Sequence, residues 1–309
     1  GKAIDDSVIN GKFPTDKQLE FSHKILEDMG YSSLNGRLDI SSHPFSSASH
    51  PTDSRITTRI HPTSVISCIS VILHEAGHAL YEMGLPQEQY GSPLGDAISL
   101  GMHESQSRWW ETRIGQSKAF WQHYLPLLKK QFKGKFDTTG LDDFYNAVNK
   151  ATPSLIRVEA DEVTYSLHVI LRFELECDLI NGNLKVEAVP EAWNAKMKSL
   201  LGITPPTNAD GCLQDIHWPV AGFGYFPCYT LGAMLAAQLF KAAQAQIPGL
   251  LDAIGSGDFA LLLTWLRSKV HGQGAMPSFA DLVEQASGGP LAVEPFVAHL
   301  RGRYLGESV

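Results

Sequence analysis

Residues 62–84 read PTSVISCISVILHEAGHALYEMG. The middle of this segment is apolar, and Pro62 and Gly84 stand at its ends, where proline opens and glycine closes a helix. The pattern predicts a long, buried helix. The motif HEAGH lies inside it, at residues 74–78.

The two histidines of this motif are four residues apart, so His74 and His78 project from one face of the helix. That spacing lets two imidazoles hold one tetrahedral ion. Glu75 leans toward the open side of the ion, where it can take a proton from a bound water. Burying these polar groups in an apolar helix without a partner would be costly, which favours a metal site over a core role.

A catalytic site of this kind needs one more protein ligand and an open position. The segment MHESQSRWWE, residues 102–111, predicts a second helix that packs on the first, with Glu104 as the third ligand. Glu111, two turns later on the same helix, competes for this role. His103 is an alternative ligand, but neighbours on a helix diverge by about 100°. We therefore expect His103 to contact a ligand side chain or the substrate.

The rest of the chain predicts a mainly helical fold. Residues 15–29 have a helical pattern, and short β-friendly pieces within residues 36–60 indicate a small antiparallel sheet. Further helices are predicted from Asp96, as N-cap, to Gly115, then at residues 153–180, 191–200, 229–245, 258–270, 278–286 and 292–304. No internal repeat or linker stands out, so we predict a single mainly α domain over residues 1–309.

Charge and composition argue against several classes of protein. The 309 residues carry a net charge of −8 without a long run of Lys or Arg, which argues against a nucleic-acid partner. No apolar run reaches the ~18 residues of a membrane span, so we expect no membrane partner. The four cysteines include no C-x-x-C pair, which fits buried thiols in a reducing compartment rather than a disulfide framework. The start has no signal-peptide pattern and no Met, which suggests a fragment or a processed form.

Four further motifs accompany HEAGH. They are DSRITT at residues 53–58, HESQS at 103–107, IRVEAD at 156–161 and GCLQDIHW at 211–218, the last followed by GFGYFPCYTLG at 222–232. In the same order they resemble the D-x-R-x-T, H-E-S-x-S, I-R-x-x-A-D and G-x-x-Q-D-x-H-W motifs of the Taq-type metallocarboxypeptidases. From the first motif to the last, the chain is similar to this HEXXH family.

The resemblance implies a helical, zincin-like metallopeptidase fold with a small antiparallel sheet beside the active cleft. It implies one divalent ion per subunit, Zn²⁺ or Co²⁺, and a cytoplasmic homodimer that removes single residues from peptide C-termini with broad specificity. It also assigns Glu104 as the third ligand. Members of the family are longer and have an additional helical N-terminal part, so we expect this chain to be the C-terminal portion of that architecture.

A carboxypeptidase must recognise the free C-terminal carboxylate of its peptide, and the planar fork of arginine suits this task. Arg55 and Arg157 are the candidates. Arg157 is one helical turn from Asp161 in the predicted helix, so an ion pair between the two is the alternative for Arg157. For Arg55 the alternative is a surface charge on a hairpin.

The last motif and the residues after it carry the remaining candidates. Polar side chains gathered on a loop often build a site. We predict that Gln214, His217, Tyr225 and Tyr229 bind the substrate. His217 or either tyrosine can donate to the oxyanion, and the sequence does not rank them. Asp215 can orient a metal-ligand histidine from behind.

Other functions for the same metal ligands stay open at this point. One is a different His₂Glu peptidase, either an endopeptidase or an aminopeptidase, although an aminopeptidase needs acidic groups to bind the substrate's amine. Another is a truncated form that binds peptides without catalysis.

Overall fold

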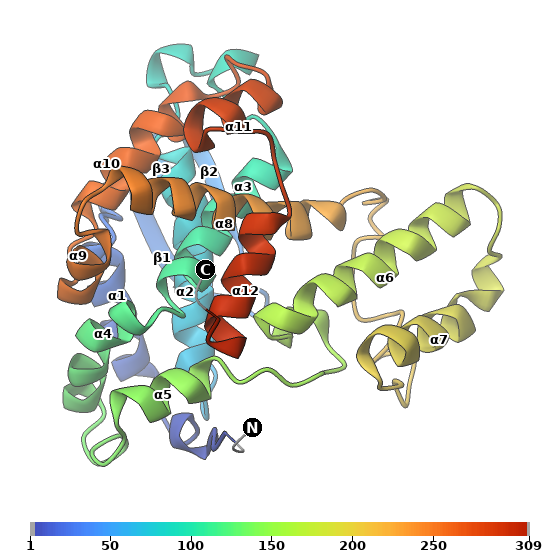
Figure 1. The fold of residues 1–309 in the computed structure, drawn as a ribbon, viewed down its shortest axis with the longest axis horizontal. Coiled ribbons are helices and arrows are strands. Elements are labelled where there is room, and N and C mark those ends of the chain that lie inside the picture. Colours follow the sequence, from blue (N-terminus) through green and yellow to red (C-terminus); the bar gives the residue numbers. More distant parts are fainter. Residues whose placement is uncertain (1–3, 308–309) are drawn as a thin grey trace. The chain divides into compact units, whose positions relative to one another are not determined.

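The computed structural model of the chain describes residues 4–307. These residues divide into two compact units, which are described separately below (Figure 1). The first unit comprises residues 4–149 and 232–299, and the second comprises residues 150–231 and 300–307. The single domain predicted for residues 1–309 stays a prediction.

The fold is mainly helical, as the sequence predicts. The first unit holds α1 (Thr15–Asp28), α2 (Val65–Glu82), α3 (Leu100–Arg108), the π-helical segment η4 (Trp109–Ile114), α4 (Lys118–Gln131), α5 (Leu141–Val148), α9 (Leu250–Ser256), α10 (Ala260–Lys269), α11 (Phe279–Ser287), most of α8 (Pro227–Gln246) and the first half of α12 (Glu294–Leu305). The second unit holds α6 (Glu162–Ile180) and α7 (Val189–Leu201). Short 3₁₀ turns lie at Ser7–Ile9, Gln87–Gln89, Pro93–Gly95, Arg157–Glu159, Val186–Ala188 and His271–Gln273. The helices α4, α5 and α9 are not among those that we predicted individually.

The sheet is small and mixed. Its strands β1 (Gly36–Ile40), β2 (Ser46–His50) and β3 (Asp53–Thr58) lie in the order β1-β3-β2. A two-residue connection joins β2 to β3 as an antiparallel pair, whereas β1 pairs with β3 in parallel. The prediction of a wholly antiparallel sheet is therefore wrong for β1. The reason is that β2 lies between β1 and β3 in the sequence but at the far edge of β3 in the sheet, so β1 and β3 run the same way.

Capping side chains fix where α2 and α3 begin. Ser64 caps α2, because its side chain accepts a hydrogen bond from the N–H of Ser67. This cap lies two residues after Pro62, the predicted start of the helix. Ser99 caps α3 by accepting from the N–H of Met102 at 3.0 Å. The predicted cap, Asp96, lies just after a 3₁₀ turn and does not start the helix.

The long helix of the second unit starts later than predicted. Asp161 caps α6, since one of its carboxylate oxygens accepts from the N–H of Val163 at 2.9 Å and of Thr164 at 3.0 Å. Arg157 therefore lies in a separate 3₁₀ turn rather than on α6. The ion pair between Arg157 and Asp161, which was the alternative to a substrate-binding role, is not formed, because Asp161 bonds to the helix N-terminus.

The core of the first unit surrounds the apolar face of α2, and β3 packs against the same helix. Ile69, Ile72 and Leu73 of α2 are buried in this core. Trp109 and Trp110 are fully buried in it as well, so they belong to the core and do not form a substrate platform. The motif HEAGH therefore lies on a rigid, well-packed helix.

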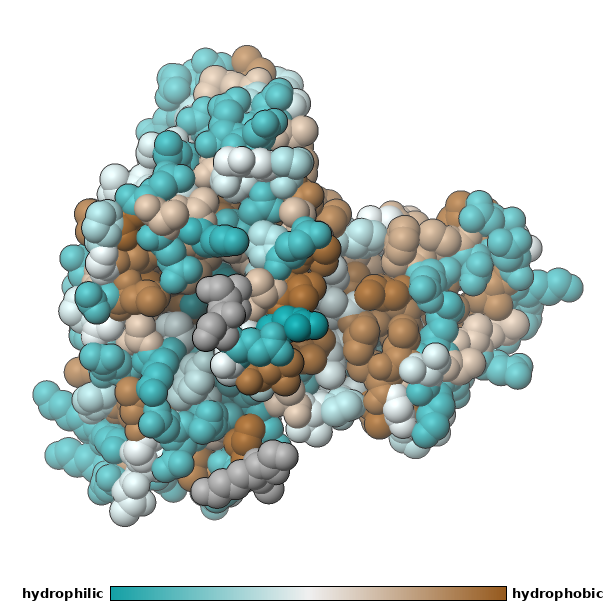
Figure 2. Space-filling view, viewed as in Figure 1, coloured by the Kyte–Doolittle hydropathy of each residue, from teal (hydrophilic) through white to brown (hydrophobic). Residues whose placement is uncertain are grey.

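In the second unit α6 packs against α7 around Leu171, Leu175, Trp193 and Met197. The outer face of α6 is apolar at helical spacing, because Val163, Ile170, Phe173 and Ile180 are all exposed. Figure 2 shows apolar side chains gathered on the surface of the part that carries α6 and α7.

All four cysteines lie in the described part of the chain and are free, as predicted. Only Cys68 is buried, and Cys177, Cys212 and Cys228 are half-buried, which corrects the prediction that all four are core residues. Among residues 4–307 no helix combines the length and the apolar character that crossing a membrane requires.

Candidate metal centre

The three predicted ligands converge in the first unit. His74 and His78 project from α2 and Glu104 from α3, and one ligand atom of each lies within 4.8 Å of the others. Glu104 Oε2 is 3.5 Å from His78 Nε2 and 3.9 Å from His74 Nε2. A tetrahedral zinc ion with bonds of ~2.0–2.2 Å separates its ligand atoms by roughly 3.3–3.6 Å. The donor set therefore fits one ion after a small contraction.

The burial of Glu104 supports the same fit. Glu104 is 6% exposed, and its other oxygen, Oε1, accepts no hydrogen bond from residues 4–307. Arg108 Nε lies 3.4 Å from Oε1 and places a positive charge beside it. A buried carboxylate with an unbonded oxygen is costly unless a cation or another donor joins it. The carboxylate of Glu104 is thus suited to a metal ion.

Two glycines allow the close approach that this convergence requires. A Cβ atom at Gly77 would lie 2.5 Å from the carbonyl oxygen of Gln106 and 2.7 Å from the Cα of Ser107, so α2 and α3 meet at their backbones. A Cβ atom at Gly232, in α8, would lie 2.7 Å from Cγ of Glu104. Larger residues at either position would displace Glu104 from the histidines.

His74 is held by a hydrogen bond at Nδ1, the ring nitrogen that faces away from Glu104. Its Nδ1 lies 2.9 Å from Glu111 Oε2, and Arg108 Nη1 donates to the same oxygen at 3.0 Å. Ser70 Oγ donates to the other oxygen, Oε1, at 3.2 Å. Because a carboxylate accepts hydrogen bonds, we infer that His74 carries its proton on Nδ1 and leaves Nε2 for a metal. Glu111, the competitor for the ligand position, lies behind a ligand instead.

Glu111 lies in a π-helical segment. The segment η4 follows α3 directly, and the N–H of Gly115 bonds to the carbonyl of Trp110, five residues earlier. Such insertions are rare and occur often at functional sites. The sequence pattern carried no signal for this feature.

His78 is held through a chain of two further side chains. Its Nδ1 lies 2.6 Å from His103 Nδ1, and His103 Nε2 lies 2.8 Å from Glu82 Oε1. We infer that His78 donates to His103 and that His103 donates to Glu82, which again leaves His78 Nε2 for a metal. We did not predict a role for Glu82. A signal was present, since Glu82 follows His78 by one helical turn.

The charges of the centre favour a cation. Burial opposes protonation of His74, but the carboxylates of Glu104 and Glu111 outweigh it and raise the pKa of His74 to about 9. Burial likewise opposes ionisation of Glu104, yet the neighbouring His74, His78 and Arg108 lower its pKa to about 2. Burial lowers the pKa of His78 to about 4. Without an ion, a protonated His74 therefore carries the positive charge that an ion would supply.

Glu75 lies next to the first ligand but outside the group of converging ligand atoms. It is 8% exposed, and burial raises the pKa of its carboxyl above the usual value. A general base is most effective when its pKa lies near the working pH, so a raised pKa suits that role.

Comparison with known proteins bears on the same residues. The family model of the carboxypeptidase Taq (M32) metallopeptidases matches residues 2–304, a span that includes HEAGH and the other motifs. The chain belongs to this family.

Relatives in the Taq family are similar along most of this chain. The thermostable carboxypeptidase 1 of Thermus thermophilus is 45% identical over 304 residues, which cover 98% of this chain and 59% of that protein. Carboxypeptidase 1 of Bacillus subtilis is 40% identical and is covered to 61%. The crystal structure of the M32 carboxypeptidase from Deinococcus radiodurans matches with a TM-score of 0.95 at 40% identity, covering 98% of this chain and 61% of that one. The chain thus spans about three fifths of the length of these relatives.

Arg157, the arginine of the I-R-x-x-A-D motif, lies in the second unit and is 4% exposed. Arg157 donates from Nε and Nη2 to Asp215 Oδ1, at 3.0 and 2.8 Å, and from Nη1 to the Tyr165 hydroxyl at 2.9 Å. The fully buried Arg172 donates from Nε to Asp215 Oδ2 at 2.7 Å. Despite burial, these two guanidiniums lower the pKa of Asp215. Arg172 is not among the predicted site residues, because it lies in an otherwise apolar stretch of α6.

The partners of Asp215 correct one prediction. Both of its oxygens bond to arginines, whereas the second ring nitrogens of the two ligand histidines bond to Glu111 and His103. Asp215 therefore does not orient a metal ligand, because its charge is needed between two buried guanidiniums.

Gln214 ties its loop to the chain before α6. Its Oε1 accepts from the N–H of Arg157 at 2.9 Å, and its Nε2 donates to the carbonyls of Leu155 and Asp210 at 3.1 and 3.0 Å. The amide group thus bonds to backbone on both sides. A contact between Gln214 and the substrate stays a prediction.

The three candidate oxyanion donors lie together in the second unit. His217 Nε2 is 2.9 Å from the Tyr229 hydroxyl, and the ring of Tyr225 lies 5.3 Å from the ring of His217. The guanidinium of Arg157 lies over the ring of Tyr229, 4.6 Å from its centre. The three residues are therefore neighbours in space, although they come from two separate stretches of sequence.

Arg55, the arginine of the D-x-R-x-T motif, lies on β3 in the first unit. Its side chain is 65% exposed, and its Nε and Nη2 each donate to the Asp53 carboxylate at 2.9 Å. This is the geometry of an exposed charge pair. A role for Arg55 in binding the substrate stays a prediction.

Proposed function

We propose that the chain is the catalytic part of a metal-dependent carboxypeptidase that removes single residues from peptide C-termini with broad specificity. The observation that carries the proposal is the convergence of His74, His78 and Glu104 with Glu75 beside them. The names of the relatives, thermostable carboxypeptidase 1 and carboxypeptidase 1, support the same reaction.

The chemistry follows from the donor set. His74, His78 and Glu104 would hold a divalent ion, either zinc or cobalt, which would act as a Lewis acid on a water molecule and on the scissile carbonyl. Glu75 accepts the proton of the attacking water and returns it to the leaving amine. Because burial favours the protonated form of Glu75, the carboxyl can hold the proton between these two transfers.

The residues behind the ligands keep the histidine rings fixed during turnover. Glu111 and His103 bond to the ring nitrogens that an ion does not use, so each imidazole keeps one tautomer and one orientation. Partners of this kind typically change metal affinity by about 10–100-fold when they are removed.

The terminal carboxylate of the peptide is proposed to bind Arg157 or Arg55. At both arginines a carboxylate of the protein, Asp215 or Asp53, already occupies part of the guanidinium fork. A peptide carboxylate would therefore exchange with, or share the fork with, a group of the same chemistry. His217, Tyr225 or Tyr229 is proposed to donate a hydrogen bond to the oxyanion.

The decisive experiment follows peptide shortening by mass spectrometry. The purified chain, loaded with zinc or cobalt, is incubated with one peptide in free-acid and in C-terminally amidated form. We expect stepwise loss of single C-terminal residues from the free acid and slow cleavage of the amide. Loss from the N-terminus would indicate an aminopeptidase, and internal fragments an endopeptidase. Metal binding without any shortening would indicate a non-catalytic, peptide-binding form.

A matched pair of variants tests the ligand assignment. Glu104→Ala should abolish stoichiometric metal binding, whereas Glu111→Ala should weaken it by about 10–100-fold, because Glu111 supports a ligand without being one. Full occupancy in the Glu104 variant would overturn the assignment. The cytoplasmic location and the homodimer that the resemblance implies remain proposals. Sedimentation of the purified chain tests whether it forms a dimer.

A further inference from the structure

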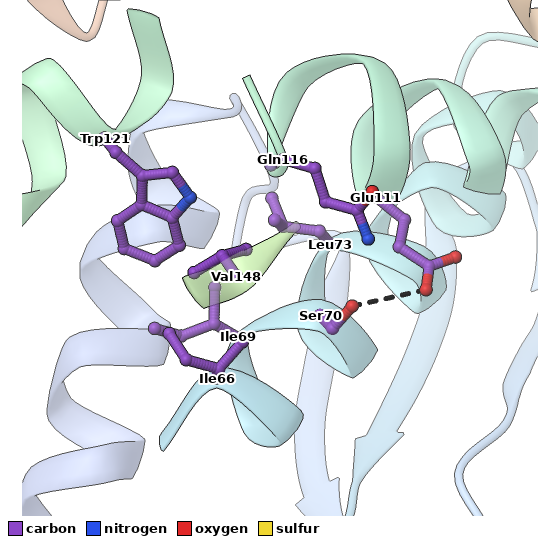
Figure 3. A pocket seen from close by; sticks show the side chains of 9 residues that line it. Ile66, Ile69, Ser70, Leu73, Glu111, Gln116, Trp121 and Val148 are labelled. Carbon is purple, nitrogen blue, oxygen red and sulfur yellow. Dashed lines mark hydrogen bonds between the residues drawn. The ribbon is translucent and has the colours of Figure 1, made fainter. Parts of the chain in front are cut away.

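A small cavity of about 40 Å³ lies in the first unit next to Glu111 (Figure 3). Most of its wall is apolar and comes from α2 and from residues after η4. Its polar lining residues are Ser70, Glu111, Gln116 and Trp121. The cavity thus borders the carboxylate that holds the ligand histidine His74.

The two oxygens of the Glu111 carboxylate have different partners. Oε2 takes the bonds from His74 and Arg108, and Ser70 donates to Oε1, the bond drawn as a dashed line in Figure 3. A carboxylate anchored at one oxygen alone can still rotate about its bond to Cγ. The Ser70 hydroxyl fixes the second oxygen and so sets the plane in which Oε2 faces His74.

The length of this bond bounds its effect. The distance from Ser70 Oγ to Glu111 Oε1 is 3.2 Å, which is long beside the ~2.5–2.7 Å of a strong hydroxyl–carboxylate bond. Ser70 is also one step further from a metal than Glu111, whose removal should change metal affinity by about 10–100-fold. We therefore expect an effect of about 3–10-fold from the hydroxyl of Ser70.

The cavity can hold water, which decides how Ser70 must be tested. Its volume exceeds the ~10–15 Å³ that one water needs. Trp121 is 1% exposed, its Nε1–H has no partner among residues 4–307, and Figure 3 shows this nitrogen on the cavity side. Water in the cavity can take the place of a deleted hydroxyl, so Ser70→Ala alone would underestimate the contribution.

We propose that Ser70 is a positioning residue of the metal centre, which holds Glu111 from the cavity side so that Glu111 keeps His74 aligned for the ion. The proposal rests on the metal-dependent function proposed above. It does not place Ser70 in contact with substrate or ion.

Two variants of equal shape isolate the hydroxyl. Ser70→Thr keeps it and Ser70→Val replaces it by a methyl group, while both add the same bulk toward the cavity and carry the same β-branched penalty in a helix. Zinc affinity is measured for each by competition with a chromophoric chelator, and unfolding in urea is measured with the metal removed. We expect Ser70→Thr to stay within twofold of the wild type and Ser70→Val to bind zinc about 3–10-fold more weakly. Equal affinities of the two variants would overturn the proposal.

A double-mutant cycle distinguishes positioning from a general effect on packing. If Ser70 acts through Glu111, the difference between Thr and Val at position 70 disappears in a Glu111→Ala background. A difference that persists there would assign the effect to packing and overturn the proposal. The visible absorption of the cobalt-loaded protein gives a second readout, since we expect Ser70→Val to shift the bands and Ser70→Thr to leave them in place.

The same measurements separate this proposal from the proposed function. A wild-type chain that binds no zinc overturns both, whereas a zinc-binding chain with equal Thr and Val variants overturns only the role of Ser70. If Ser70→Val does not fold, Ser70→Cys takes its place, because a thiol is close to a hydroxyl in size but is a weak donor. We expect Ser70→Cys to weaken zinc binding about as much as Ser70→Val, and wild-type affinity would refute the positioning role.

Discussion

The substitution Gly77→Ala tests whether the close contact of α2 with α3 sets the metal geometry. Gly77 lies within HEAGH and does not have a positive φ, so alanine can adopt its backbone conformation. At an open helix position this change would stabilise the helix by up to about 1 kcal/mol. Here the added Cβ would meet backbone atoms of α3, and the steric term opposes the helix propensity.

The structure gives the size of the displacement. The Cβ would lie 2.5 Å from the carbonyl oxygen of Gln106, whereas real Cβ contacts essentially never fall below 3.0 Å and rarely below 3.4 Å. The helices must therefore separate by 0.5 Å (3.0 minus 2.5) to 0.9 Å (3.4 minus 2.5). Glu104 lies two residues before this contact, and metal–ligand distances tolerate only about 0.2 Å. We expect zinc affinity to fall by about 10–100-fold and the metal-free protein to lose about 1–3 kcal/mol of unfolding free energy.

Competition with a chelator measures the zinc affinity, and urea unfolding of the metal-free protein measures its unfolding free energy. Gly255→Ala is the matched control, since Gly255 is also helical but its added Cβ would have no neighbour closer than 3.8 Å. The control should keep wild-type zinc affinity and be as stable as the wild type or slightly more stable. A Gly77→Ala protein that binds zinc within twofold of the wild type would refute the argument that backbone contact sets the ligand geometry.

Four further predictions concern the site. Glu75→Gln should keep zinc binding and unfolding free energy but lower kcat by about 10²–10⁴-fold, and activity within about tenfold of the wild type would exclude a general base. Because the pKa of His74 is about 9 without a metal, zinc binding near pH 7.5 should release about one proton from it, which calorimetry in buffers of different ionisation enthalpy measures. This folded-state pKa lies above the usual 6.5, so protonated His74 stabilises the metal-free protein fully below pH 6.5. The contribution is lost as the pH rises through 9. An unfolding free energy that does not change over this pH range would contradict the charge assigned to His74. Arg157→Ala should lower kcat/KM for free-acid peptides by a factor worth about 2–5 kcal/mol, and Arg55→Ala should lower it by less. The reverse order would identify Arg55 as the residue that binds the terminal carboxylate. Equal wild-type rates on free-acid and amidated peptides would exclude a carboxypeptidase.

The convergence of the three predicted ligands could be foreseen because helix geometry governs it. A spacing of four residues places His74 and His78 on one face whatever surrounds the helix, and a following helix offers a carboxylate within reach. The prediction for Glu104 needed only that α3 pack on α2. The depth of that packing could not be predicted, because it depends on which atoms lie opposite Gly77, and those belong to a different helix.

The arginine of the second unit shows where the sequence misleads. The apolar pattern around residues 154–180 predicts one long helix, and within it Arg157 and Asp161 would be neighbours. The side chain of Asp161 instead bonds to the first N–H groups of α6, so the helix begins there and does not include Arg157. Local side-chain bonding of this kind competes with the helix, and the periodicity of apolar residues does not reveal it. The long-range partner of Arg157, Asp215, is 58 residues away in the sequence.

The different roles of Glu104 and Glu111 also arise from packing rather than from spacing. In a regular α-helix seven residues make a rotation of about 700°, so both carboxylates would lie on one face, two turns apart. In the structure α3 ends at Arg108 and the wider η4 follows, with Trp109 and Trp110 buried in the core. Glu104 then approaches His74 on its Nε2 side, at 3.9 Å, while Glu111 bonds to Nδ1 at 2.9 Å. Two carboxylates thus flank one imidazole: Glu104 lies at Nε2, where it can share an ion with His74, and Glu111 bonds to Nδ1 and holds the ring in place.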